Sequence, residues 1–431
     1  MIPFFDIRKE NQFLTSNFVE DLKLFLESGQ FVLGEAVTDF ENQFADFCSS
    51  ECCVGTSNGL DALRLIFEGY KVLGLLDDGD EVLVPAHTYI ASILAVVQSG
   101  LVPVFVEPKS ESYSMCVNDA EHKLTHKTKA CLGVHLYGEL MDVEGFQKFT
   151  SAHNLLFIED AAQAHGAVSS DRQKAGAIGH AAAFSFYPTK NIGALGDAGA
   201  VTTNDRDLEV VIRKLQNYGS ANKNQHDLLG FNMRLDALQA RFLSSKLKKY
   251  PNQLKRRQQI AQRYINEINN PKISLPNHPN DESHVFHLFV VRVKNRNQFT
   301  SFLASHKIGS LIHYPTPPHK QASLQDYNVL SLPLTELYHK EVVSIPLYPS
   351  LTDQEIKHII DVLNKYSKYY KYVDYKISSF FDYKKIIKKF KKKFKIITAL
   401  SVFYDLEKPN DFLKGIEKLL DINGIALIEI A

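Results

Sequence analysis

Cysteine is scarce in this sequence, and its spacing argues against two kinds of stabilisation. The 431 residues contain five cysteines, and no pair of them forms a Cys-x-x-Cys motif. Disulfide frameworks usually have an even number of cysteines, and structural zinc sites usually show that motif. We therefore expect no disulfide and no metal site, which fits the reducing environment of the cytoplasm.

The sequence also lacks an excess of one charge and a long apolar run. It has 49 basic and 49 acidic side chains, so no overall attraction to nucleic acid is expected. No apolar run approaches the ~20 residues that a bilayer-spanning helix needs. Residues 1–6 lack the basic and apolar regions of a secretory signal. We expect a cytoplasmic protein that binds no nucleic acid and does not insert into a membrane.

Short apolar segments alternate with helical patterns over the first half of the chain. The segments at 81–85, 102–106, 129–136 and 155–160 are apolar almost throughout. This order is typical of a parallel sheet that helices cover on both faces. The Gly-x-Gly-x-x-Gly pattern of dinucleotide-binding folds is absent. The length predicts two to three domains.

A single lysine stands at the exit of one predicted buried strand, at residues 181–184. Pro188 ends this strand because proline has no N–H for the ladder, and Lys190 follows. The run of small residues at 193–199 lets backbone and a ligand approach closely. A lysine in such a pocket can lose its proton and attack a carbonyl. Taken alone, a lysine in this position is far more often an ordinary surface lysine in a loop.

A carboxylate upstream makes the functional interpretation stronger. Asp160 ends the apolar segment 155–160, thirty residues before Lys190. Open α/β sheets place their sites at the carboxyl ends of strands. Pyridoxal phosphate (PLP) chemistry needs a lysine amine for a Schiff base and a carboxylate that keeps the pyridine nitrogen protonated. A strand-end aspartate can also be a simple cap of the next helix.

A third element is suited to binding the phosphate of such a cofactor. Gly59 and Leu60 stand at the start of a helix predicted for residues 61–72. Free backbone N–H groups at a helix start attract anions. The structural alternative is a plain helix cap by Ser57 or Asn58.

Together these stretches resemble a known family. Residues 58–63, 155–166, 185–191 and 230–240 closely resemble the PLP-dependent nucleotide-sugar aminotransferases of the DegT/DnrJ/EryC1/StrS group, in order and approximate spacing. The resemblance covers residues 1–368. It implies an α/β, type I aminotransferase-like PLP fold. A large domain, 1–250, would hold a mainly parallel sheet covered by helices, and a smaller α+β domain would span 251–368.

The resemblance also assigns the centre of the cofactor site. Lys190 would form the Schiff base and then move protons, while Asp160 would hold the pyridine nitrogen charged. The backbone amides of Gly59 and Leu60, together with the hydroxyl of Ser185, would bind the phosphate.

Three further cofactor contacts follow from the resemblance. Tyr89 would stack on the pyridine ring, and Gln163, expected one helical turn after Asp160, would contact the cofactor's phenolic oxygen or its face. Asn232 would reach across a dimer interface to the phosphate of the neighbouring subunit, which implies a homodimer with composite active sites. From the residues alone, Tyr89 could be a packing residue and Asn232 a helix cap.

A proline-rich loop at 312–321 is expected near the mouth of the site. The resemblance implies that Tyr314 and His319 contact the substrate, and His313 fits a substrate contact and a structural role equally well. The alternative for the whole segment is an ordered surface loop.

The implied reaction is transfer of an amino group from L-glutamate to a keto sugar carried by a nucleotide. Residues 58–63 and 313–319 look most like the branch that aminates C3 of dTDP-3-keto-6-deoxyhexoses, in deoxyaminosugar biosynthesis for O-antigen or surface polysaccharide. One alternative is a UDP- or GDP-linked 4-keto sugar as substrate. The other is a non-catalytic regulator with a PLP fold.

The tail, residues 371–431, differs from the rest. It holds eight lysines between 384 and 395, followed by strand and helix patterns. It resembles the later half of an S-adenosylmethionine-dependent sugar C-methyltransferase, but the glycine-rich loop that binds the methyl donor is missing. We therefore expect this extension to have no methyltransferase activity.

Overall fold

A computed structural model describes residues 1–12, 15–110, 112–222, 225–276, 282–369, 394–400, 417 and 420–429. The chain forms two compact units, Met1–Ser367 and Lys368–Ala431. All five cysteines are free. Within the described ranges, no helix is long and apolar enough to cross a membrane, and no group of three or more His, Cys, Asp or Glu could hold a metal ion.

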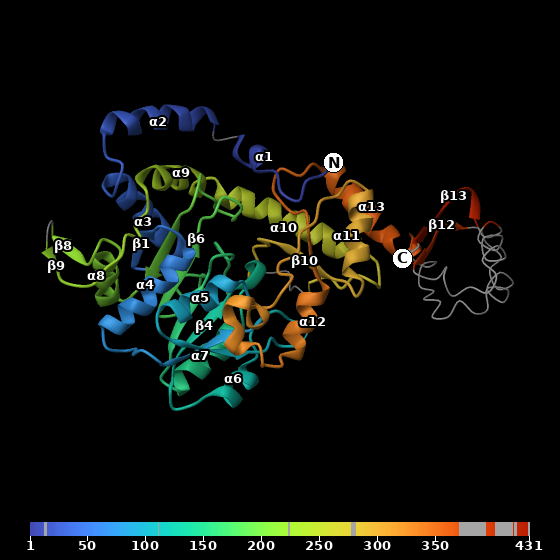
Figure 1. Ribbon diagram of the computed structural model, residues 1–431. Helices are drawn as coiled ribbons and strands as arrows, with labels where there is room; N and C mark the ends of the chain where they lie inside the picture. Colours follow the sequence, from blue (N-terminus) through green and yellow to red (C-terminus); the bar gives the residue numbers. More distant parts are fainter. Residues whose placement is uncertain are drawn as a thin grey trace. The chain divides into compact units, whose positions relative to one another are not determined.

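The first unit is built on a seven-stranded sheet (Figure 1). Its strand order is β1-β7-β6-β5-β4-β2-β3, and only β7 runs antiparallel to its neighbours. The predicted mainly parallel sheet is thus confirmed. The strands are β1 Cys52–Thr56, β2 Glu81–Pro85, β3 Val102–Val106, β4 Thr128–Val134, β5 Leu156–Asp160, β6 Ala181–Ser185 and β7 Gly199–Thr203.

Helices cover both faces of this sheet because its strands are apolar on both sides. Along β5, Phe157 packs into one core and Ile158 into the other. The first core receives α3 (Glu35–Cys48), α7 (Val143–Ala152) and α9 (Ala237–Leu247). The second receives α4 (Gly59–Val72), α5 (Ile90–Gln98) and α8 (Arg206–Leu215). Residue-by-residue alternation along the strands therefore separates two cores.

The later part of this unit is smaller. It begins with α10 (Tyr250–Glu267) and contains the antiparallel pair β10 (Phe289–Arg292) and β11 (Val342–Ile345). The helices α11 (Arg296–Ser305), α12 (Pro333–Glu341) and α13 (Asp353–Tyr369) complete it. The sequence has a long helical pattern from Arg234 to about Asn269 that Pro251 is expected to break, and the structure confirms this break, since α9 ends at Leu247 and α10 begins at Tyr250. The division of the first unit at residue 250 stays a prediction.

One predicted strand in this part is shorter than expected. The alternation of apolar and polar residues over 284–293 predicts a strand, but β10 covers only Phe289–Arg292. Phe286 has a positive φ of 46°, and its amide donates to His284 Nδ1 instead of to a neighbouring strand. The amides of Val285 and Leu288 bond to the turn at Tyr137–Gly138. Residues 284–288 therefore anchor that turn rather than extend the ladder.

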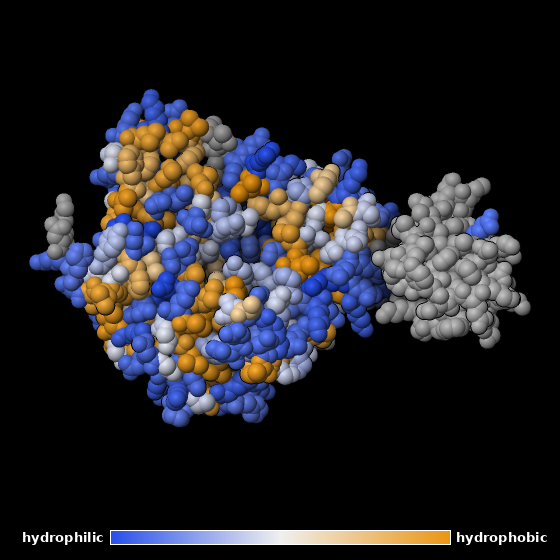
Figure 2. All heavy atoms as spheres, viewed as in Figure 1, coloured by the Kyte–Doolittle hydropathy of each residue, from blue (hydrophilic) through white to orange (hydrophobic). Residues whose placement is uncertain are grey.

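The remaining elements lie around this frame. The N-terminal helices are α1 (Ile7–Asn11) and α2 (Thr15–Ser28), and α6 (Val117–Lys123) follows β3. A short hairpin consists of β8 (Ser220–Asn222) and β9 (Gln225–His226). Figure 2 shows apolar side chains gathered over α2, where Val19, Leu24 and Leu26 are exposed.

In the second unit, β12 (Phe394–Leu400) and β13 (Leu420–Glu429) pair in parallel. Both strands fall on patterns that the sequence suggested. The helix pattern of the tail falls on residues 410–420, and most of it, like most of the lysine-rich segment, lies outside the described residues. The likeness to a methyltransferase and the lack of that activity stay predictions.

Candidate active site

Asp160 and Lys190 leave the sheet at the same edge. β5 and β6 are parallel neighbours, with Asp160 opposite Ala183, and their carboxyl ends therefore meet. The amide of Ala161 donates to the Ala183 carbonyl, which continues the pairing past the end of β5. The carboxylate lies close enough to favour the charged form of Lys190 and to raise its pKa. The pair that PLP chemistry requires is thus brought together.

The Asp160 carboxylate is held from two sides. Ser92 on α5 donates from Oγ to Oδ2 at 2.7 Å, and the amide of Ala162 donates to Oδ1 at 3.2 Å. Asp160 is only 8% exposed. Ser92 itself is buried, and the sequence analysis did not assign it to the site. The available signal was a polar residue on the buried face of the otherwise apolar helix α5.

The environment of Lys190 lowers the pKa of its amine. Burial lowers its pKa from 10.5 to about 8, although the nearby Asp160 carboxylate opposes this effect. Burial and then the Lys190 charge lower the pKa of His165 to about 3 and that of His313 to about 4. These histidines stay neutral near pH 7, so Lys190 is the cation of this group that titrates closest to physiological pH.

The turn that carries Lys190 is fixed by the backbone. The Lys190 amide donates to the Tyr187 carbonyl at 2.8 Å, and the Ala194 amide returns to the Phe186 carbonyl at 2.8 Å. A Cβ atom on Gly193 would lie 2.3 Å from the Pro188 carbonyl oxygen. Close backbone approach explains the small residues after the lysine.

A suitable phosphate site lies where α4 begins. Asn58 caps this helix by accepting from the Asp61 amide, as one reading of the sequence expected. In the described part of the chain, the amides of Gly59 and Leu60 have no acceptor, as is usual for a first helical turn.

Close packing brings a hydroxyl to the same place. A Cβ atom on Gly59 would lie 2.7 Å from the Cβ of Ser185, at the end of β6. Gly199 on β7 likewise leaves room for the Asn58 backbone, since a Cβ there would lie 2.4 Å from its carbonyl. Two helix N–H groups and one hydroxyl converge, and these residues fit a phosphate group.

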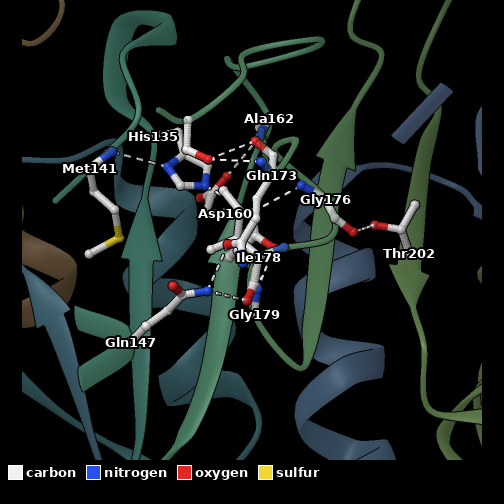
Figure 3. Close-up of polar contacts among 12 residues, drawn as sticks. His135, Met141, Gln147, Asp160, Ala162, Gln173, Gly176, Ile178, Gly179 and Thr202 are labelled. Carbon is white, nitrogen blue, oxygen red and sulfur yellow. Dashed lines mark hydrogen bonds and ion pairs between the residues drawn. The ribbon is translucent and has the colours of Figure 1, made fainter. Parts of the chain in front are cut away.

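A buried carboxylate beside Asp160 has a structural role that the sequence did not reveal. Glu159 accepts from the amides of Gly176, Ile178 and Gly179 and from His135 Nε2, all within 2.9 Å (Figure 3). His135 Nδ1 in turn accepts from the Met141 amide. His135 is therefore a core histidine with both nitrogens satisfied.

Three polar side chains lie close together near Asp160, namely those of Gln163, Tyr89 and Tyr314. Gln163 Nε2 donates to the Tyr314 hydroxyl at 3.3 Å, and the rings of Tyr314 and Tyr89 lie 4.9 Å apart. Tyr89 is half exposed, so its ring is not a core packing residue. The expectation that a helix places Gln163 was wrong, because residues 161–166 form turns. Strand pairing continues through Ala161, and the chain then turns sharply.

The two histidines of the proline-rich loop are placed differently. His313 Nδ1 forms a hydrogen bond with Ser344 Oγ at 2.8 Å. The Lys190 charge is close enough to help lower the pKa of His313. His319 is fully buried, and its Nε2 lies 3.3 Å from Glu336 Oε1. A substrate cannot contact a side chain without exposed surface. The predicted substrate contact by His319 is therefore corrected to a packing role.

Asn232 does not cap a helix. The residue before α9 is Asp236, and Asn232 forms an isolated β-bridge with Asn217. Asn232 is exposed at the surface of the described chain. This excludes the helix-cap alternative but leaves its contact with a second subunit a prediction.

Comparison with known proteins agrees with this geometry. The sequence profile of the DegT/DnrJ/EryC1/StrS aminotransferase family matches residues 12–364. A dTDP-3-amino-3,6-dideoxy-alpha-D-galactopyranose transaminase of Aneurinibacillus thermoaerophilus is 46% identical over 85% of this chain and 99% of its own length. A dTDP-3-amino-3,4,6-trideoxy-alpha-D-glucose transaminase of Streptomyces venezuelae is 38% identical, over 85% and 96%.

Solved structures agree as well. S. venezuelae DesV in complex with a ketimine intermediate matches with a TM-score of 0.82 and 38% identity, covering 85% of this chain and 98% of that one. Bacillus subtilis ntda with bound cofactor PMP matches with a TM-score of 0.77 and 30% identity, over 84% of each chain. The expected aminotransferase fold is therefore confirmed. The chain belongs to the DegT/DnrJ/EryC1/StrS family of PLP-dependent aminotransferases.

Proposed function

We propose that this enzyme transfers the amino group of L-glutamate to C3 of a dTDP-3-keto-6-deoxyhexose, for deoxyaminosugar biosynthesis in the cytoplasm. The observation that carries the transamination is the pairing of Asp160 with a lysine of lowered pKa at one sheet edge. The choice of sugar is supported by the A. thermoaerophilus relative, a dTDP-3-amino-sugar transaminase that matches over nearly its whole length.

Each residue of the site then has a definite task. When bound, PLP supplies a carbonyl that condenses with amines and a ring that accepts electrons. Asp160 would accept a hydrogen bond from the ring nitrogen and hold it charged. Gly59, Leu60 and Ser185 would anchor the phosphate.

Lys190 would act twice. Its amine would first hold the cofactor covalently. When free, the same amine would act as the base that takes the proton from the donor's α-carbon and later returns it. A pKa of about 8 suits this role, because a base works best when its pKa is close to the working pH.

A panel of nucleotide sugars tests the substrate. We expect fast amination of dTDP-3-keto-6-deoxyhexoses with L-glutamate as donor, and slow or no reaction with UDP- or GDP-linked 4-keto sugars. Product formation is measured by mass spectrometry of the aminated sugar nucleotide. A preference for a 4-keto substrate contradicts the proposed sugar. If L-glutamate does not react with the holoenzyme even in the absence of a sugar, transamination itself is contradicted.

We also infer a homodimer in which Asn232 serves the partner's phosphate. Asn232 is exposed, and the segment that follows it bridges to Val32 through Asp236. Phe31 and Val32 are each about half exposed, which is unusual for neighbouring apolar residues on a surface that remains free. This supports an interface beside Asn232.

Mixed dimers test this arrangement. We expect Lys190→Ala and Asn232→Ala chains to be weak alone, but their mixture to regain about a quarter of wild-type activity. Half of randomly mixed dimers are hybrids, and each hybrid keeps one intact site if Asn232 acts across the interface. As a control, Lys190→Ala is mixed with the Lys190→Ala/Asn232→Ala double variant, which should regain nothing. No recovery in the first mixture contradicts the composite site.

A further inference from the structure

A buried network behind the site holds the backbone on either side of Tyr314. The Tyr137 hydroxyl donates to the His313 carbonyl, and His339 Nδ1 donates to the Tyr314 carbonyl at 2.8 Å. His87 Nε2 lies 3.1 Å from the Tyr137 hydroxyl. Tyr137, His87 and His339 are each at most 2% exposed. We call these three residues the carbonyl clamp.

Proton counting fixes the hydrogen bonds of the clamp. A carbonyl oxygen only accepts hydrogen bonds. The Tyr137 hydroxyl therefore donates its single hydrogen to the His313 carbonyl, and His339 carries its proton on Nδ1. The Tyr137 oxygen must then accept from His87, which therefore carries its proton on Nε2. Burial lowers the pKa of His339 to about 4 and that of His87 well below its usual range. Both rings stay neutral near pH 7, and this pattern holds throughout the physiological range.

Tyr137 also acts through its backbone. Its amide donates to Gln163 Oε1 at 2.7 Å, which leaves Gln163 Nε2 to donate to the Tyr314 hydroxyl. Tyr137 thus fixes the Tyr314 backbone through its hydroxyl and the Tyr314 side chain through Gln163. It adopts a φ of 61°, which is uncommon for any residue other than glycine and typical of functional sites.

We propose that Tyr137 is a positioning residue that sets the Tyr314 ring against Tyr89 and thereby controls acceptance of the sugar substrate. The inference rests on the proposed function, since it takes Tyr314 as a wall of the sugar site. The hydroxyl of Tyr137 touches neither Lys190 nor Asp160 in the structure. The step with the amino donor should therefore be spared, and the step with the keto sugar affected.

Tyr137→Phe removes the hydroxyl and keeps both the ring and the backbone amide. In the holoenzyme we expect the amides of residues 312–314 and 316 to exchange hydrogen about tenfold faster, while those of β5 stay unchanged. We expect kcat/KM for the keto sugar to fall about tenfold, and the L-glutamate half-reaction to stay within about twofold. Tyr70→Phe is the matched control, because its buried hydroxyl has no partner among the described residues.

A second pair of variants tests the contact between His339 and the Tyr314 carbonyl. His339→Asn keeps a donor near the position of Nδ1 and should behave like the wild type, whereas His339→Leu should repeat the Tyr137→Phe pattern. Unchanged exchange of residues 312–314 and 316 in Tyr137→Phe overturns the inference, as does an equal loss in both half-reactions. If the wild type aminates no nucleotide sugar, the proposed function fails, and the exchange measurement still decides whether the clamp holds Tyr314.

Discussion

Replacing Lys190 with alanine should lower turnover by more than about 10⁴-fold, because one side chain supplies both the covalent link and the proton transfer. The fold should survive this change. No hydrogen bond or ion pair of Nζ is found within the described residues, and burial already disfavours the charge. Thermal stability without cofactor should therefore be unchanged or higher.

The measurements separate the covalent role from the charge. Wild-type protein treated with borohydride should carry the reduced cofactor on the peptide that contains Lys190, and the alanine variant should not. Lys190→Arg keeps the positive charge and should be equally inactive. Lys246→Ala removes a second lysine whose pKa burial lowers to about 8, and should retain activity. Substantial turnover by Lys190→Ala, or a labelled peptide elsewhere in the chain, contradicts the assignment.

The second large effect is expected at Asp160. Asp160→Asn keeps the shape of the side chain but removes its charge, so the ring nitrogen of the bound cofactor loses its anionic partner. We expect turnover to fall by about 10²–10³-fold, the range seen when one preorganised electrostatic contact is removed.

The same substitution should shift the titration of the lysine. Asp160 raises the pKa of Lys190, so its neutralisation should move this pKa below the wild-type value of about 8. The neutral amine reacts with the cofactor, and the pH midpoint for cofactor uptake by the apoprotein should therefore fall. Asp142→Asn is the control, since Asp142 caps α7 and asparagine caps equally well. A midpoint that rises, or unchanged turnover, contradicts the pairing.

The sequence predicted those features that depend on short segments. Strand β5 with Asp160 at its end, strand β6 with Lys190 beyond it, and Gly59 at the start of α4 all appear in the structure as expected. Each of these follows from local chemistry, such as an apolar run that ends in a polar residue or a glycine that opens a helix.

Features that depend on distant pairing could not be predicted. Ser92 meets Asp160 across 68 positions, and Tyr137 meets His313 across 176. Only the fold makes these residues neighbours. The two errors at the site have the same origin: His319 looked like a loop residue but is buried beside Glu336, and Gln163 looked helical although strand pairing continues through Ala161.

The adjacent carboxylates of β5 bear on how mutational surveys of this enzyme should be interpreted. Glu159 points away from Asp160, because successive strand residues face opposite sides, and there it ties residues 176–179 to the sheet. Substitutions at both positions would abolish activity in a simple screen. At 159 the loss would come from an unfolded loop, and at 160 from an unpaired ring nitrogen. Intolerance to change is thus no guide to chemistry here, whereas the amount of soluble, folded protein tells the two acids apart.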